Sequence, residues 1–107
     1  MKIENTEAQM RKGILELCVL SITDKAPAYP SDILKQLKAS HLIVVEGTIY
    51  PLLNRLSKAD LLSYDWVESE SGPPRKYYTT TDDGKSVLSK LKIHWNNLQS
   101  SVQLLIA

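Results

Sequence analysis

Residues 44–62, with the sequence VVEGTIYPLLNRLSKADLL, combine the pattern of an amphipathic helix with a proline near its start. Four aliphatic residues in this stretch are spaced by three and four, which places them on one face of a helix. They are Ile49, Leu52, Leu53 and Leu56. The stretch therefore predicts a helix with one buried face and one polar face.

Pro51 has two alternative positions in this helix. If Thr48 caps the helix, Pro51 lies in the first turn, where a backbone N–H has no intrahelical partner to lose. If the helix begins a few residues earlier, Pro51 should bend it. In both cases the proline marks the N-terminal end of a helix that is stiffened where it would meet a groove.

Two further helices are predicted upstream. Residues 10–22 carry a wide apolar stripe, which is typical of a helix packed on more than one side. Pro27 and Pro30 mark the following loop, and Ser31 is the expected cap of a helix over residues 32–39.

A β-hairpin is predicted after the central helix. Residues 62–68 alternate along the first strand, with Trp66 expected to be structural, and residues 75–81 are rich in aromatic and β-branched side chains. The intervening SGPP should form the turn, which would place Arg75 and Lys76 at the hairpin tip. Tyr77 and Tyr78 should point to opposite sides, one into the core and one toward backbone phosphate.

A last helix is predicted from residue 81 or 82 to residue 107, with apolar residues stepping by three and four. This stripe is the expected dimer interface. It includes Val87, Leu91, Trp95, Leu98 and Val102.

The order helix, helix, helix, hairpin, helix predicts a mainly α protein with a small β-hairpin, namely a winged helix-turn-helix with a C-terminal dimerisation helix. Residues 1–81 would form the DNA-binding part and residues 82–107 the dimerisation helix of one structural unit. In a winged helix-turn-helix the third helix lies in a major groove and the hairpin touches the flanking backbone.

The composition limits the size of the protein and the class to which it can belong. The chain has 107 residues, a mass of 12.0 kDa, 43% hydrophobic and 23% charged residues and a formal charge of +1, which is typical of one small globular domain. A single cysteine and the lack of a secretion signal favour the cytoplasm. No apolar run approaches the roughly 20 residues that span a bilayer, so no membrane partner is expected.

Two motifs carry a family resemblance. GTIYPLLNRL (residues 47–56), followed by LL and then SGPPRKYYTTTDDGK (residues 71–85), closely resembles the PadR family of bacterial transcriptional regulators. The resemblance covers roughly residues 12–98. It implies a repressor that binds a pseudo-palindromic operator on double-stranded DNA. The single terminal helix resembles the short subfamily, which implies a homodimer built through that helix.

The candidate DNA contacts lie on the third helix and on the wing. Tyr50, Asn54 and Lys58 are spaced by four and lie opposite the leucines, where the alternative is an ordinary solvated face. The full set of expected contacts is Thr48, Tyr50, Asn54, Arg55, Lys58, Arg75 and Lys76.

Trp95 has two interpretations. An aromatic residue on the last helix is ordinarily interface packing. The resemblance implies a second role, because Trp95 is similar to the tryptophan of multidrug-sensing members that meets its symmetry mate and stacks on flat aromatic compounds. The resemblance thus implies a small aromatic effector at Trp95 as the alternative to plain interface packing.

Enzymatic and metal-binding functions are not expected. Cys18 lies in a buried stripe, and His41 and His94 have no spacing typical of a metal site or of a nucleophile with its base. We expect no cofactor. The rival to a DNA-binding regulator is a winged-helix module for protein–protein contact, which the near-neutral charge favours, whereas the intact PPRKYY wing favours DNA.

Overall fold

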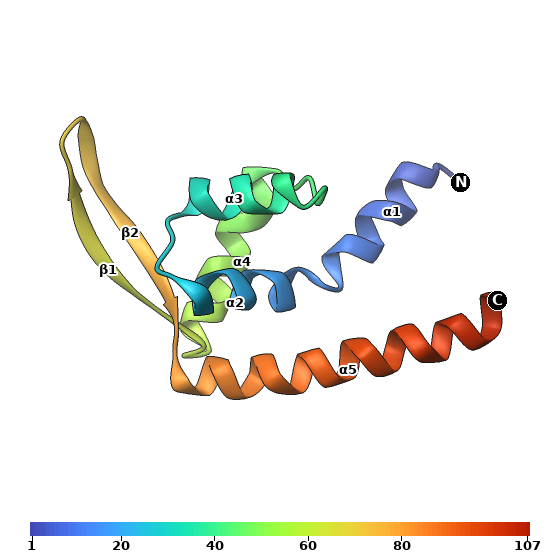
Figure 1. The fold of residues 1–107 in the computed structure, drawn as a ribbon. Helices are drawn as coiled ribbons and strands as arrows, with labels where there is room; N and C mark the ends of the chain where they lie inside the picture. The colour runs from blue at the N-terminus through green and yellow to red at the C-terminus, as the bar shows by residue number, and fades with distance from the viewer.

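A computed structural model describes all residues from 1 to 107. Three helices, α2, α3 and α4, form the body, the hairpin projects from one side, and α5 runs along α2 and extends beyond the body (Figure 1). The elements are α1 (Ile3–Lys12), α2 (Leu15–Lys25), α3 (Pro30–Ala39), α4 (Glu46–Lys58), β1 (Leu62–Ser69), β2 (Gly72–Thr80) and α5 (Asp82–Ile106). The mainly α fold class with a wing and a long terminal helix is confirmed.

The hydrophobic core lies among α2, α3 and α4 and is closed by the base of the hairpin and the start of α5. The four aliphatic residues of α4 that define its helical pattern are all buried, as predicted. Burial of this face gives the helix most of its stability, because a helix of this length is marginal by itself. The buried apolar residues are Leu15, Val19, Leu20, Ala28, Ile33, Leu37, Ile49, Leu52, Leu53, Leu56, Leu62, Tyr78 and Leu88.

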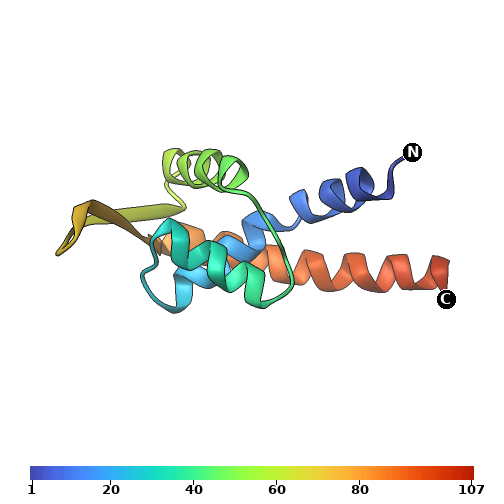
Figure 2. The same cartoon turned by 90° about the horizontal axis from the view of Figure 1, so that it is seen from above.

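The start of the predicted first helix is wrong. The chain breaks at Gly13 and Ile14 into two helices, and Met10 lies on α1, which has no buried residue. Glycine has the poorest helix propensity after proline, so a change of direction here costs little. The break turns α1 away from the body, toward the same end as the far half of α5 (Figures 1 and 2).

The start of α3 also differs from the prediction. Tyr29, not Ser31, is the residue before the helix, and Pro30 occupies the first helical position, where its fixed φ suits a helix and its missing N–H costs nothing. The Tyr29 N–H donates to the Asp32 carboxylate at 3.4 Å. The cap is therefore formed by an acidic residue in the first turn.

The proline of α4 follows the second alternative. The helix begins at Glu46 after Val45, which supplies no capping side chain, so Thr48, the cap in the first alternative, lies inside the helix. Pro51 lies inside the helix and leaves the carbonyl of Gly47 without its usual donor. Both residues are exposed, so water can satisfy that carbonyl.

The hairpin is an antiparallel pair in which Trp66 faces Lys76 and Val67 faces Arg75. Its turn lies at residues 70–71, so the turn predicted over SGPP (residues 71–74) is misplaced, and Pro73 and Pro74 belong to β2. The register shifts between Val67 and Ser69, in the stretch that faces the prolines, because proline cannot donate to the ladder.

Helix α5 follows the wing without a linker, and its predicted start is confirmed. Thr81 caps it, with its Oγ1 accepting from the Gly84 N–H at 2.9 Å and donating to the Asp60 carbonyl at 2.7 Å. The Thr81 N–H also donates to the Leu61 carbonyl at 3.1 Å. Three hydrogen bonds at one residue therefore fix the start of α5, two of them directly to the junction of α4 and β1.

Candidate nucleic-acid interface

The outer face of α4 is free of contacts from the rest of the body. Figure 2 shows α4 as the uppermost helix, with its upper side uncovered. Tyr50, Asn54 and Lys58 are all exposed, which agrees with the predicted polar face, and Arg55 is exposed beside them. Thr48 is half-buried. This face has the shape and polarity that a helix needs to enter a major groove.

One flank of α4 faces α1 and α2. Thr48 and Arg55 line a cleft of about 450 Å³ there, together with Lys12 at the end of α1. The Arg55 guanidinium lies 3.0 Å from the Glu16 carboxylate of α2. Because both side chains are largely exposed, this ion pair contributes little to stability and can exchange for a phosphate. Sequence reasoning missed Lys12 and Glu16, since only the fold brings them to α4.

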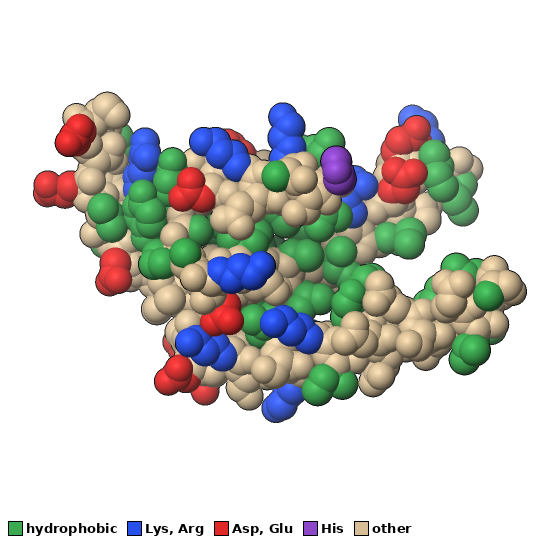
Figure 3. Space-filling model, in the orientation of Figure 1, with side chains coloured by type: hydrophobic (Ala, Val, Ile, Leu, Met, Phe, Trp, Pro, Cys, Tyr) green, Lys and Arg blue, Asp and Glu red, His purple; other side chains and the backbone are tan.

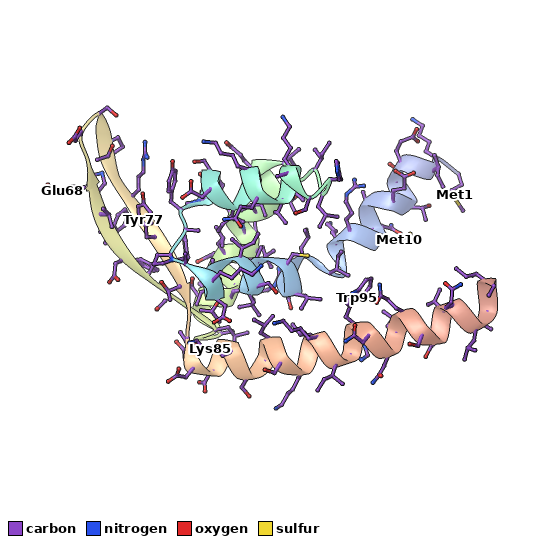
Figure 4. All side chains as sticks on the ribbon, in the orientation of Figure 1. Met1, Met10, Glu68, Tyr77, Lys85 and Trp95 are labelled. Atoms are coloured by element: carbon purple, nitrogen blue, oxygen red, sulfur yellow. The ribbon has the colours of Figure 1, made fainter.

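The other flank of α4 faces the wing. Tyr50, Arg75 and Lys76 line one cleft of about 470 Å³, so the structure brings these three predicted residues together. The remaining lining residues are Tyr29, Pro30, Ser31, Trp66, Pro74 and Tyr78. The predicted position of the cations at the wing tip is wrong, because both lie within β2, whereas Glu70 lies in the turn and Glu68 just before it. Figure 4 shows Glu68 on the outer part of the wing, and Figure 3 shows acidic side chains at this end of the molecule.

Both cations of the wing, Arg75 and Lys76, form cation–π contacts with aromatic rings. The Arg75 guanidinium lies 4.7 Å from the centroid of the Tyr29 ring. The Lys76 ammonium lies 4.4 Å from the ring centroid of Tyr64 and 5.3 Å from that of Trp66. Trp66 is 63% exposed, so the structure gives no support to the purely structural role expected for it.

The two adjacent tyrosines of β2 divide as predicted between core and surface. Tyr78 is buried, and Tyr77 is half-buried with its ring centroid 5.2 Å from that of Tyr29. Burial raises the pKa of the Tyr78 phenol, and the neighbouring Tyr64 and Tyr50 raise it further. Tyr78 therefore remains neutral at physiological pH beneath the cationic cleft.

The predicted dimer stripe on α5 has two parts. Val87 and Leu91 pack against the core of their own chain, whereas Leu98 and Val102 are 46% and 43% exposed. Trp95 is half-buried and points from α5 toward the junction of α1 and α2 (Figure 4). It lines a mostly apolar groove of about 450 Å³ with Met10 and Ile14, as well as Leu98 and Val102.

Few side chains could act as a nucleophile or as metal ligands. Burial raises the pKa of the Cys18 thiol, which lowers the fraction of reactive thiolate. No three side chains among the histidines, cysteines and carboxylates come together as metal ligands. No helix has both the length and the apolar character needed to cross a bilayer.

A three-helix body, an exposed polar helix face and a hairpin with two cations define the winged helix-turn-helix class of DNA-binding proteins. Residues 19–90 match the model of the "Transcriptional regulator PadR-like family". The chain belongs to this family of transcriptional regulators.

Solved structures agree with this assignment. A PadR-like transcription factor from Bacteroides fragilis is 54% identical, with a TM-score of 0.79, and the match covers 94% of this chain and 98% of that one. A PadR family regulator from Eggerthella lenta is 35% identical, with a TM-score of 0.90 and coverage of 97% and 91%. A protein from Lysinibacillus sphaericus is 31% identical over 61 residues, which are 57% of this chain. The match spans 56% of the length of that protein.

Proposed function

We propose that this regulator is a cytoplasmic repressor that binds a pseudo-palindromic operator as a homodimer. The observation that carries the proposal is the exposed polar face of α4 with a cation-lined cleft on each side. Residues 1–81 form the DNA-binding part, in which Asn54 and Lys58 lie at the middle of the face. Thr48 and Arg55 contact DNA on the flank next to α1 and α2. Tyr50, Arg75 and Lys76 contact DNA on the flank next to the wing.

Dimerisation through residues 82–107 would place two such faces on one side of the assembly. The far half of α5 exposes Leu98, Val102, Leu104, Leu105 and Ile106, of which Leu98, Val102 and Leu105 lie on one face of the helix. A second copy is the occupant that the repeating stripe suits, because equivalent helices can pair about a two-fold axis. Val87 and Leu91 then hold α5 in position by packing against the core of their own chain.

Selection of bound duplexes from a random DNA pool tests the function. The proposal predicts an enriched inverted repeat whose half-sites are one helical turn apart, roughly 34–36 Å. Asn54→Ala should change the enriched sequence, whereas Lys76→Ala should weaken binding to all sequences and reduce the salt slope by about one for each phosphate that it no longer neutralises. Recovery of no preferred sequence would favour a winged-helix module for protein contact.

Trp95 is the proposed site of a small aromatic effector. A planar ligand would enter the apolar groove, stack on the indole and gain roughly 0.5–1.5 kcal/mol per ring pair beyond area burial. Repression would be relieved only if the ligand prefers a dimer geometry that cannot span both half-sites. Flat dyes should therefore quench the tryptophan fluorescence of the wild type but not of Trp95→Ala, and quenching that survives in that variant would exclude this site.

A further inference from the structure

The first turn of α4 places a carboxylate on the face that we propose for DNA. Glu46 precedes Tyr50, Asn54 and Lys58 by successive steps of four residues, so these side chains lie along one side of the helix. All of them are exposed, and no ion pair of the structure includes Glu46. The exposed face of α4 therefore begins with an unpaired negative charge.

Glu46 lies between the two cation-lined clefts that flank α4. The next residue, Gly47, lines the cleft on the α1 side, and Tyr50, one turn further along the same face, lines the cleft on the wing side. Neither cleft has a carboxylate in its lining. When the two phosphate strands of a duplex occupy these clefts, the groove between the strands faces Glu46.

Gly47 gives the first turn of α4 a shape that the fold itself does not require. A Cβ at this exposed position would meet no atom within 4 Å, and no glycine of the chain has a positive φ. Neither packing nor backbone conformation calls for glycine here, although glycine weakens a helix relative to alanine. The absence of a side chain suits a partner that approaches this turn closely, as a DNA groove does.

A carboxylate makes a favourable direct contact with DNA only where the DNA offers a hydrogen-bond donor. Phosphates repel it, and the donors in the major groove are the N4 amino group of cytosine and the N6 amino group of adenine. Adenine carries its N7 acceptor beside N6, which suits an amide such as that of Asn54 but opposes a carboxylate. Cytosine has no such acceptor beside N4, so the chemistry of Glu46 matches cytosine.

We infer that Glu46 recognises a cytosine in the major groove of each half-site by accepting a hydrogen bond from its N4 amino group. Glu46 is thus a specificity-determining residue, because its negative charge lowers the affinity for DNA in general and is compensated at one base. The inference rests on the proposed function and adds to it the identity of one base.

The alternative role of Glu46 is structural. An acidic residue in the first turn of a helix interacts favourably with the helix dipole, and Val45 supplies no capping side chain to α4. A purely structural role would leave the preferred DNA sequence unchanged when the carboxylate is removed. Glu4 provides a matched control, because it is an exposed acidic residue in the first turn of α1.

Selection of bound duplexes with the wild type, Glu46→Gln and Glu4→Gln tests the inference. The wild type should enrich one C·G base pair that Glu46→Gln replaces by A·T, because the glutamine amide can bond N6 and N7 of adenine. The other positions should not change, and Glu4→Gln should enrich the wild-type sequence. For duplexes that differ at this base pair in one half-site, the wild type should prefer cytosine by roughly five- to 150-fold, and Glu46→Gln should favour adenine.

Binding to a random duplex shows whether the variant is folded. Glu46→Gln should bind such a duplex more tightly than the wild type, because it removes a charge that repels phosphates. If the wild type enriches a sequence but Glu46→Gln enriches the same base at every position, or changes a position that is not cytosine, the inference is wrong and the proposed function still stands. If the wild type enriches no sequence, the proposed function itself fails.

Discussion

The side-chain oxygens of Thr23 and Thr80 lie 2.7 Å apart in the core, where they join α2 to the last residue of β2. The Thr80 hydroxyl also donates to the Leu20 carbonyl at 2.9 Å, and the Thr23 hydroxyl lies 2.9 Å from the Val19 carbonyl. Both threonines are buried, so their polar groups depend on each other and on the backbone of α2.

Thr80→Val should lower the free energy of unfolding by about 1–3 kcal/mol, because it removes a buried donor and leaves Thr23 with a poorer set of partners. Urea denaturation of the purified protein measures the change. Thr79→Val, on the opposite face of β2, is the control and should have a much smaller effect. Equal midpoints for Thr80→Val and the wild type would show that the pair does not stabilise the fold.

Gly84 is required by the close approach of α5 to the wing. A Cβ at this position would overlap the Leu61 carbonyl oxygen and lie 2.7 Å from the Thr80 methyl carbon. Gly84→Ala should therefore destabilise the protein by about 1–3 kcal/mol despite alanine's better helix propensity. Gly47→Ala is the control, since a Cβ there meets no atom within 4 Å. A thermal melt that ranks Gly84→Ala above the wild type would contradict the packing argument.

The ion pair between Arg55 and Glu16 should compete with DNA. Glu16→Gln frees the guanidinium and removes a negative charge beside α4, so affinity for the operator should increase while stability changes by less than about 1 kcal/mol. Arg55→Ala should weaken binding and reduce the salt slope by about one per protomer. Fluorescence anisotropy over a range of salt concentrations measures both. Weaker binding by Glu16→Gln would mean that Glu16 positions Arg55 instead of sequestering it.

The oligomeric state should depend on one face of α5. Leu98→Glu places a charge in the apolar stripe and should give monomers at micromolar concentration, where the wild type should sediment as a dimer. Ile93→Glu is a matched control, because Ile93 is 63% exposed but lies on the opposite side of the helix from Leu98. Equal dissociation by both substitutions would place the interface elsewhere.

Alkaline pH should destabilise the protein through Tyr78. Its folded-state pKa is raised, so the protonated phenol favours the fold, and this contribution is complete below the unfolded value of about 10. The contribution is lost as the pH rises through the raised value. Urea midpoints at pH 8 and above pH 10 should differ less in Tyr78→Phe than in the wild type. An unchanged difference would assign the alkaline loss to other groups.

Local patterns predicted the helices that pack in the core, since a buried face imposes strict spacing on Ile49, Leu52, Leu53 and Leu56. The break at Gly13 was not predicted, because apolar residues continue across it on both sides. The tip of the wing was misplaced, because the two prolines of SGPP suit a strand as well as a turn when a register shift accommodates them.

The candidate site was predicted less completely than the fold. Periodicity identified the polar face of α4, but only the tertiary structure brings Lys12, Glu16 and Tyr29 to its flanks. The exposure of Trp66 could not be inferred from alternation in β1, because alternation defines two faces and does not say whether either face is covered. The β-bridge between Ala28 and Tyr78 holds the chain before α3 against β2. It therefore closes one side of the cleft that Tyr50, Arg75 and Lys76 line.

The fixed start of α5 makes this helix a lever. With 25 residues it is about 37 Å long, and a rotation of roughly 5° about one end moves the other by about 3 Å. Thr81 bonds directly to Asp60 and Leu61, so a rotation of α5 acts directly on the junction of α4 and β1. If two chains pair through α5 as proposed, a change of a few degrees in the angle between the two helices would shift the two DNA-binding faces relative to each other by a large part of one base-pair step, without deforming either of them.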